Sequence, residues 1–190
     1  FYKTDGATQM NAIIGIRKKC VGLLGNMDGH RRPVPFIEDT AVPPQNLADY
    51  IADLRVFLTA QGLVCGLFGH SDAGCLHVRP ALDLRLEEDE AFIKTVTDGV
   101  VALLKKHGGV LWGEHGKGLR GSYTADLIGT PYYALMQAIK HHLDPLNRLN
   151  PGKIAGDDLT PIDHAPLRGQ YDRQIDPALS LQFPKATQCN

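Results

Sequence analysis

Residues 62–78 predict a β-hairpin, and this hairpin fixes how the neighbouring segments can pair. Its two halves, GLVCGLF and CLHV, are rich in Val, Leu and Phe, and the residues between them include Asp, Ala and Gly, which favour turns. We expect Ala73 and Gly74 to form a two-residue turn. In that register His70 lies opposite His77, with Cβ atoms roughly 4.5–5.5 Å apart.

Two histidines at that separation suit the binding of one metal ion. The alternative interpretation is a buried turn that carries two ordinary histidines. A pair of histidines is incomplete as a metal site, so a third ligand is needed. Glu114, in the segment VLWGEHGKG, is the candidate, because a predicted helix returns the chain from the hairpin to the same sheet. His115 beside it is a candidate general base, although alone this pair would be an ordinary acid and histidine on a loop.

Apolar periodicity predicts the elements around the hairpin. Strands are expected at 34–42 and from Val110, and helices over 6–24, from Pro44 to Gly62, from Phe92 to His107 and over 131–143. The order strand–helix–strand–strand–helix–strand is the split β-α-β arrangement of ferredoxin-like α+β domains. We therefore expect an antiparallel sheet with helices on one face, and flanking N- and C-terminal helices. The free face should carry His70, His77 and Arg79.

Composition excludes several classes of function. The chain has 190 residues and a formal net charge of −1, so no basic surface suggests nucleic acid. No apolar run is long enough to span a bilayer, and no signal peptide is visible. The 4 cysteines show no C-x-x-C spacing, which is typical of reduced thiols in a cytoplasmic protein.

The domain organisation is predicted from the change in composition near residue 156. Residues 1–156 are expected to form the domain, and the polar, Pro-containing residues 157–190 are expected to form an extended tail. The chain begins at FYKTDG without a methionine and ends at KATQCN. We therefore expect a fragment of a larger polypeptide.

The segments FGHSDAGCLH, GEHGKG and LDPLNRLNPGKI together resemble the C-terminal substrate domain of FAD-linked oxidases. These vanillyl-alcohol-oxidase-type flavoproteins include D-lactate, glycolate and D-2-hydroxyglutarate dehydrogenases. The resemblance runs from about Arg17 to Lys153. It is strongest to the large branch in which an iron–sulfur domain follows the flavin domain in the same polypeptide.

The resemblance implies roles for particular residues. The metal ligands that it implies are His70, His77 and Glu114, and the metal is taken as Zn²⁺. His115 would remove the hydroxyl proton of a 2-hydroxy acid while hydride passes to the flavin. Arg17 would help to hold the substrate carboxylate, and Asn150, in the N-P-G-K segment, would lie near the FAD.

The resemblance also implies cofactors and partners beyond this chain. FAD would be bound mostly by an N-terminal flavin domain, and a 4Fe-4S cluster by a C-terminal iron–sulfur domain. Cys189 would be the first cysteine of that domain, or else a lone thiol in the tail. A peripheral link to an electron acceptor at the inner membrane would follow.

Two departures from the commoner family pattern put the substrate pocket in doubt. Cys75 replaces an asparagine in the hairpin, and Ile37 stands where a lysine is common. Arg79, Arg31 or Arg32 could supply the missing cation, and the alternative for each is a solvated surface arginine. Arg79 is the preferred candidate, because strand alternation places it on the face that carries the hairpin histidines.

Three functions remain open at this point. The first is the substrate- and metal-binding part of an FAD-dependent D-2-hydroxyacid dehydrogenase, with D-2-hydroxyglutarate preferred and D-lactate as the second choice. The others are a metal- or ligand-binding module without redox chemistry and a metal-dependent hydrolase. The N-P-G-K segment and the expected truncation favour the dehydrogenase.

Overall fold

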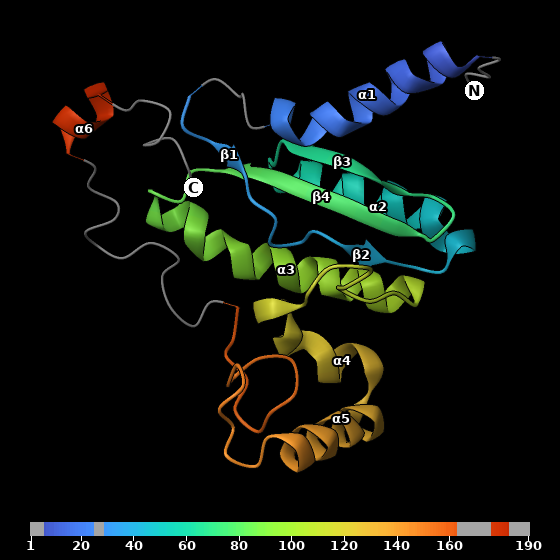
Figure 1. The fold of residues 1–190 in the computed structure, drawn as a ribbon, viewed down its shortest axis with the longest axis vertical. Coiled ribbons are helices and arrows are strands. Elements are labelled where there is room, and N and C mark those ends of the chain that lie inside the picture. Colours follow the sequence, from blue (N-terminus) through green and yellow to red (C-terminus); the bar gives the residue numbers. More distant parts are fainter. Residues whose placement is uncertain (1–5, 25–28, 163–175, 183–190) are drawn as a thin grey trace.

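A computed structural model describes residues 6–24, 29–162 and 176–182 (Figure 1). The strands are β1 (Arg32–Pro33), β2 (Thr40–Ala41), β3 (Cys65–His70) and β4 (Cys75–Leu82). The helices are α1 (Ala7–Leu24), α2 (Leu47–Ala60), α3 (Glu87–His107), α4 (Thr124–Ile128), α5 (Thr130–Leu143) and α6 (Pro177–Gln182). Short 3₁₀ turns, η1 (Pro44–Asn46) and η2 (Gly118–Tyr123), precede α2 and α4. One antiparallel sheet with separate helices confirms the α+β class, and α1, α2, α3 and α5 confirm the four predicted helices.

Strand β4 is the centre of the sheet. β3 pairs with one of its edges, and β1 and β2 pair with different ends of the other edge, all antiparallel. A single bridge between Ala41 and Val110 adds the last segment beyond β2. Because β3 and this last segment lie at opposite edges, the connectivity is the split β-α-β arrangement predicted from the order of elements.

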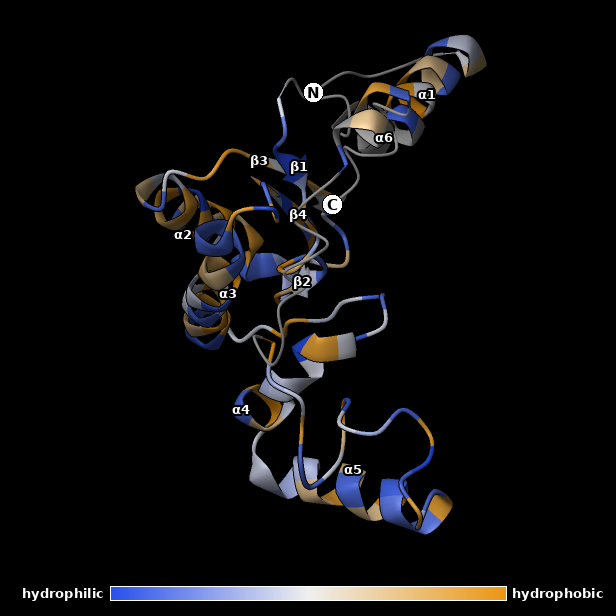
Figure 2. Cartoon of the chain, turned by 90° about the vertical axis from the view of Figure 1, so that its left-hand side faces the viewer, coloured by the Kyte–Doolittle hydropathy of each residue, from blue (hydrophilic) through white to orange (hydrophobic). Residues whose placement is uncertain are grey.

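Helices α2 and α3 lie on the same side of the strands (Figure 2). Their apolar sides form the core with alternate residues of β4. The buried members of this cluster from the three elements include Leu54, Leu58, Val96, Val100, Leu104, Leu76, Val78 and Leu82. Because side chains alternate along a strand, His77 and Arg79 of β4 point to the opposite face. That face carries the candidate site.

The hairpin forms, but its predicted register is wrong by two residues. His70 pairs with Cys75 and Phe68 pairs with His77, so four residues, 71–74, make the turn. Gly74 has φ +67° and its carbonyl accepts a hydrogen bond from the Val42 amide at 3.1 Å. This contact with a distant segment sets the turn length. A slip of two residues leaves each side chain on its expected face.

The predicted strand over 34–42 is interrupted. Residues 36–37 form a turn between β1 and β2, and Asp39 has φ +74°. A non-glycine residue adopts that conformation only where its surroundings stabilise it. The carboxylate of Asp39 accepts backbone hydrogen bonds from residues 113–115, so a tertiary contact bends the strand.

Within the predicted tail, residues 177–182 form the short helix α6. Pro177 supplies a helical φ at the start of this helix, and Asp176 Oδ1 accepts a hydrogen bond from the Ala178 amide at 2.8 Å. Packed structure also continues beyond residue 156, because Ile162 is buried in the core. Cys189 lies outside the described residues.

Helices α4 and α5 extend the chain below α3 (Figure 1). Helix α4 packs on α3, and α5 packs on α4. The Tyr133 hydroxyl of α5 donates a hydrogen bond to the Gly156 carbonyl at 2.9 Å, which fixes the segment after α5 against that helix. Across the described residues, no helix combines the length and the apolar character needed to cross a membrane.

Candidate metal centre and substrate site

His70, His77 and Glu114 meet on the helix-free face of the sheet. The Nε2 atoms of His70 and His77 lie 3.1 and 2.9 Å from the same atom, Glu114 Oε1. The two imidazole rings are 5.5 Å apart between centroids and nearly perpendicular. The rings are diagonal rather than directly opposite across the hairpin, and their side chains span the difference. The structure therefore brings together the three residues that the sequence analysis selected.

Asp39 fixes the backbone of the segment that carries Glu114. Its carboxylate accepts hydrogen bonds from the amides of Gly113, Glu114 and His115 at 2.8, 2.8 and 2.9 Å. Burial alone would raise the pKa of Asp39, but these bonds and a contact from the Cys75 thiol together lower it. A buried, charged carboxylate thus replaces the strand pairing that residues 113–115 lack.

Gly113 and Cys75 pack against that carboxylate. A Cβ atom on Gly113 would lie 2.6 Å from Cys75 Sγ, so only glycine allows this approach. Burial raises the pKa of the Cys75 thiol to about 12, and a hydrogen bond to Asp39 and the nearby carboxylates add to the effect. Cys75 is therefore a protonated thiol that donates to Asp39, and it is not a nucleophile.

Glu38 is a second buried carboxylate beside the histidines. Its Oε1 atom lies 3.6 Å from His77 Nδ1 and 3.5 Å from His115 Nδ1. The rings of His77 and His115 stack at 5.1 Å between centroids and 16° between planes. His115 is about half exposed, with Nε2 3.8 Å from Glu114 Oε1. The predicted base thus lies next to the predicted ligands with one edge open to solvent.

Two groups of side chains, neither of which includes His70, have all their ligand atoms close enough to share an ion among the described residues. The ligand atoms of Asp39, Cys75, His77 and Glu114 lie within 4.8 Å of one another, and so do those of Glu38, His77 and His115. In the first group Asp39 is saturated by backbone amides and Cys75 keeps its proton. In the second group Glu38 is already bound to Arg79. Both groups include His77, which makes it the central residue of the cluster.

The donor set of His70, His77 and Glu114 fits a divalent metal. Two imidazole nitrogens and one carboxylate oxygen are a common three-ligand set for zinc that leaves room for another ligand. The two separations from Glu114 Oε1, 2.9 and 3.1 Å, are a few tenths shorter than the roughly 3.3 Å between neighbouring ligand atoms around tetrahedral zinc. The nitrogens of His70 and His77 do not lie within 4.8 Å of each other, so binding of one ion would draw the two rings closer together. His77 Nδ1 is buried without a hydrogen-bond partner in the described chain, yet it faces Glu38. A metal-bound histidine commonly donates its other N–H to a carboxylate.

Arg79 lies on the same face but is not a solvated surface arginine. Its Nε and Nη2 atoms each donate to Glu38 at 2.8 Å, and its guanidinium lies 5.7 Å from the centre of the Phe68 ring. Its side chain is 22% exposed. This bidentate pair holds the arginine and the buried carboxylate in one geometry.

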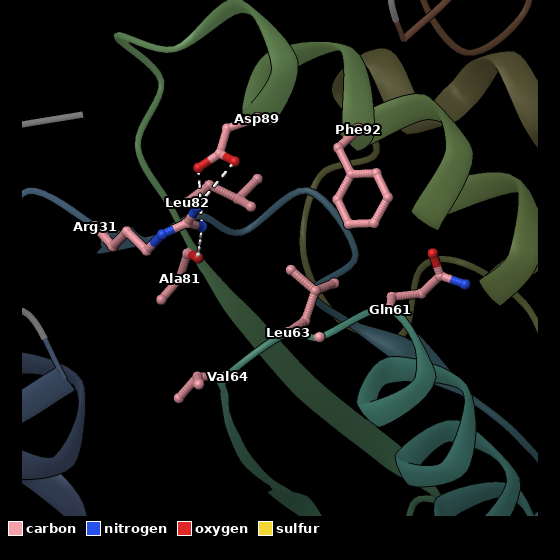
Figure 3. A pocket seen from close by; sticks show the side chains of 9 residues that line it. Arg31, Gln61, Leu63, Val64, Ala81, Leu82, Asp89 and Phe92 are labelled. Carbon is pink, nitrogen blue, oxygen red and sulfur yellow. Dashed lines mark hydrogen bonds and ion pairs between the residues drawn. The ribbon is translucent and has the colours of Figure 1, made fainter.

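Arg31 and Arg32 lie at the other end of β4, where β1 pairs with Leu82. Arg31 binds Asp89 at 2.9 Å and lines a cavity of about 260 Å³ with Gln61 and Phe92 (Figure 3). Arg32 donates to backbone carbonyls of residues 29 and 31. Five residues of strand, about 16 Å, separate His77 from Leu82. The structure therefore does not bring these two arginines to the histidine cluster.

Two cations that the sequence analysis did not select flank the cluster. Arg120 donates to the carbonyls of Glu38 and Gly116, and so ties the Glu114 segment to the interrupted strand. Lys117 places Nζ 3.9 Å from the centre of the Trp112 ring, and burial lowers its pKa. Within the described residues Lys117 has no carboxylate partner. A half-buried ammonium without a counter-ion is a potential contact for an anion.

The two remaining candidate site residues are Arg17 and Asn150. Arg17 belongs to α1, but its side chain lies outside the described part of the chain. Asn150 is exposed, has φ +50° and follows the turn after α5. The Asp144 carboxylate accepts hydrogen bonds from the Arg148 and Leu149 amides at 2.9 Å and fixes this turn. No contact joins Asn150 to the histidine cluster among the described residues.

Glu38 and Asp39 are two buried carboxylates of the cluster that were not selected from the sequence. They are adjacent acids inside an otherwise apolar segment, VPFIEDTAV. Buried carboxylates are costly unless they have partners, so this pair was a signal for a polar site within the strand. Arg79, Arg120 and three backbone amides are those partners.

The fold and the site together define an α+β domain that gathers histidines and carboxylates on the helix-free face of its sheet. Residues 2–154 match the family model described as FAD linked oxidases, C-terminal domain. The chain belongs to this family, which confirms the resemblance drawn from its three motifs.

Proteins similar to this chain have related names. The chain is 52% identical over 191 residues to a D-2-hydroxyglutarate dehydrogenase of Pseudomonas putida, covering 98% of this chain and 19% of that protein. It is 50% identical to a D-2-hydroxyglutarate dehydrogenase of Escherichia coli, covering 94% of this chain and 18% of that protein. A mitochondrial D-lactate dehydrogenase (cytochrome) of Kluyveromyces lactis is 32% identical over 76% of this chain and 25% of that protein. The chain thus spans about a fifth of the length of its more similar relatives.

Proposed function

We propose that this chain is the substrate- and metal-binding part of an FAD-dependent dehydrogenase that oxidises D-2-hydroxyglutarate to the 2-oxo acid. The observation that carries the proposal is the convergence of His70 Nε2 and His77 Nε2 on Glu114 Oε1. It occurs in a chain about half identical to D-2-hydroxyglutarate dehydrogenases. Neither observation alone would select this reaction.

The cluster divides into ligands and a base. His70, His77 and Glu114 would hold a divalent metal, for which Zn²⁺ is the best candidate. Bound there, such an ion would supply Lewis acidity that makes a substrate hydroxyl group more acidic, and FAD would supply the hydride acceptor. His115 would receive the hydroxyl proton at Nε2, because its Nδ1 faces Glu38 and its outer edge is open to solvent.

Arg79 would contact the distal carboxylate of the substrate. It follows His77 by two residues on β4 and shares its face. Glu38 engages Nε and Nη2, which leaves Nη1 as a directed donor. Arg17 and Asn150 are proposed to contact the substrate carboxylate and the flavin, on the basis of family membership.

The remaining partners are proposed to lie in the rest of the polypeptide. The similar dehydrogenases are about five times longer than this chain. We propose that FAD is bound mostly by a flavin domain, that a 4Fe-4S cluster lies in a domain that begins near Cys189, and that electrons pass to a membrane-bound acceptor. A cytoplasmic location is proposed with them.

Oxidation of D-lactate is the second candidate, because D-lactate dehydrogenases are also similar to this chain. The lower identity, 32% and 31% against about 50%, makes it the weaker one.

The test is the reduction of flavin in the full-length protein, with D-2-hydroxyglutarate, L-2-hydroxyglutarate and D-lactate as substrates and an artificial dye as the final acceptor. We expect kcat/KM to be highest for D-2-hydroxyglutarate, the L-enantiomer to be inactive, and a chelator to abolish turnover reversibly. A higher value for D-lactate would select the second candidate. A protein that binds zinc but reduces no flavin with either D-hydroxy acid would be a metal-binding module without redox chemistry.

A further inference from the structure

Glu38 faces the Nδ1 atoms of both His77 and His115, whereas Glu114 lies on the Nε2 side of both rings. The side chain of Glu38 is only 5% exposed. The Nδ1 atoms of His77 and His115 lie 3.6 and 3.5 Å from Oε1. Arg79 donates from Nη2 to Oε1 and from Nε to Oε2, each at 2.8 Å. Three of these four groups therefore meet at Oε1, which makes that oxygen the point shared by both imidazoles and the guanidinium.

The interrupted strand is what brings Glu38 to this position. It precedes Asp39, whose φ of +74° turns the chain between β1 and β2. Its main-chain carbonyl accepts a hydrogen bond from Arg120 Nη1, and its side chain is bound by Arg79. Glu38 is therefore held at both its backbone and its carboxylate, and it offers the histidines a fixed acceptor.

A fixed acceptor matters because both histidines need the same tautomer. His77 would bind metal through Nε2, and His115 would accept a proton at Nε2, so each must carry its own proton on Nδ1. Both Nδ1 atoms face Glu38. The stacked rings, 16° from parallel, allow one carboxylate to face both atoms at once. The Nδ1 atoms of His77 and His115 lie 3.6 and 3.5 Å from Oε1, each roughly 0.5 Å beyond an ordinary hydrogen bond. His77 Nδ1 is buried without a hydrogen-bond partner in the described chain, so a small shift of the ring would complete this contact.

We propose that Glu38 is a positioning residue that sets the tautomer and ring orientation of the metal ligand His77 and of the base His115 together. Arg79 is the counter-ion that fixes it in place. The inference rests on the proposed function, because it assigns a role to Glu38 within that site. In this arrangement the metal ligand His77 and the base His115 share one orienting group. A substitution of Glu38 therefore weakens metal binding and proton removal at the same time.

The matched control is Asp83→Asn. Asp83 is also a nearly buried carboxylate in a bidentate pair, with Arg85 Nε at 2.8 Å and Nη2 at 2.6 Å, and it directly follows β4. It has no contact with either histidine. Glu38→Gln and Asp83→Asn thus each remove one buried charge of an arginine pair, and only the first replaces an acceptor oxygen in the group that faces the imidazoles by an NH₂ donor.

The experiment compares these two variants with the wild type in the full-length protein. Zinc affinity is measured by competition with a chelator, the melting temperature is measured without zinc, and kcat and KM for D-2-hydroxyglutarate are measured at saturating zinc. We expect Glu38→Gln to lower zinc affinity by about 10- to 100-fold and kcat by a similar factor, with little change in KM. Asp83→Asn should leave affinity and kcat within about threefold while lowering the melting temperature comparably.

A third variant, Glu38→Asp, keeps the charge and shortens the reach, so it should recover part of both losses. It also provides the readout if Glu38→Gln does not fold. Zinc affinity and kcat that stay within about threefold in both Glu38 variants would overturn the inference while leaving the proposed function intact. If Asp83→Asn lost as much zinc affinity and kcat as Glu38→Gln, the inference would be overturned as well, because the effect would then be structural. A wild type that neither binds zinc nor oxidises D-2-hydroxyglutarate would reject the proposed function first.

Discussion

At the scale of single residues, Asp39 decides whether the site can form. Three backbone amides point at one buried carboxylate, so its charge replaces the strand pairing of residues 113–115. Hydrogen bonds outweigh burial and lower its pKa. Because the folded pKa lies below the unfolded value of about 3.9, the stabilisation is present above about pH 4 and is lost as the pH falls through the folded value.

We therefore expect Asp39→Asn to lower the free energy of unfolding by about 1–3 kcal/mol at pH 7, because an amide NH₂ would face backbone donors. Asparagine tolerates positive φ as well as aspartate does, so the backbone is not the cause. Urea unfolding at pH 7 and at about pH 3 measures the effect. The difference in the free energy of unfolding between the variant and the wild type should be smaller at the lower pH. A difference that does not depend on pH would mean that the carboxylate charge is not what anchors the segment.

A second prediction distinguishes the two ligand sets that share His77 and Glu114. His70→Ala should lower zinc affinity by about 100-fold or more, since it removes one of three protein ligands. Cys75→Ser should leave it within about tenfold, because a thiol with a pKa of about 12 that donates to Asp39 is not a ready ligand. Chelator competition on both proteins decides between the sets. If Cys75→Ser lost as much affinity as His70→Ala, the metal would lie deeper, against Asp39.

At the scale of elements, the hairpin illustrates what local sequence can and cannot predict. The turn residues and the alternation of apolar residues predicted where β3 and β4 lie and which sheet face carries each histidine. Both features are local, because side chains along a strand alternate between the two faces with a period of two residues. The register was wrong, because the turn is set by Val42, about 30 residues earlier in the chain. The interruption at Glu38 and Asp39 was missed for the same reason, since its partners come from residues 79 and 113–120. Glu114 and His115 were found because their motif is contiguous.

The glycines near this hairpin give a paired test of that explanation. Gly74 and Gly62 have φ +67° and +68°, so alanine at either position carries a similar backbone penalty of about 1–2 kcal/mol. A Cβ on Gly74 would lie 1.9 Å from the Val42 carbonyl oxygen, whereas nothing lies within 4 Å of one on Gly62. Gly74→Ala should therefore destabilise the protein clearly more than Gly62→Ala, by about 2 kcal/mol or more. Thermal unfolding of both variants measures this, and equal losses would show that the turn can move away from Val42.

At the scale of the whole molecule, the sheet separates two environments. Helices α2 and α3 cover one face with apolar side chains, and the other face collects Glu38, Asp39 and Glu114 with Arg79, Arg120 and Lys117. The buried charges there are paired or hydrogen-bonded, and Lys117 lies over an indole instead. The sequence predicted which face would carry His70, His77 and Arg79, because the apolar positions of the helices and of β4 require a common core. It could not predict which cations would already be neutralised.

The last prediction asks which of these cations contacts a distal substrate carboxylate. The guanidinium of Arg79 is held in one direction by Glu38, whereas Lys117 has no carboxylate partner in the described part of the chain and lies over Trp112. Because Glu38 fixes the guanidinium and leaves Nη1 as a directed donor, Arg79 is the better match for a carboxylate, so we expect Arg79→Met to lower kcat/KM for D-2-hydroxyglutarate far more than for D-lactate, which has no distal carboxylate. The loss of one buried charge contact, about 2–5 kcal/mol, corresponds to a decrease in kcat/KM of roughly 30- to 4,000-fold.

Arg79→Met also leaves Glu38 buried without its partner, so the control is the double variant that also carries Glu38→Gln. In both variants only the ratio of kcat/KM between the two substrates is compared. Equal losses on both substrates would mean that Arg79 acts through Glu38 or on the shared C1 carboxylate. A selective loss in Lys117→Met instead would move the distal subsite to the indole side of the cluster.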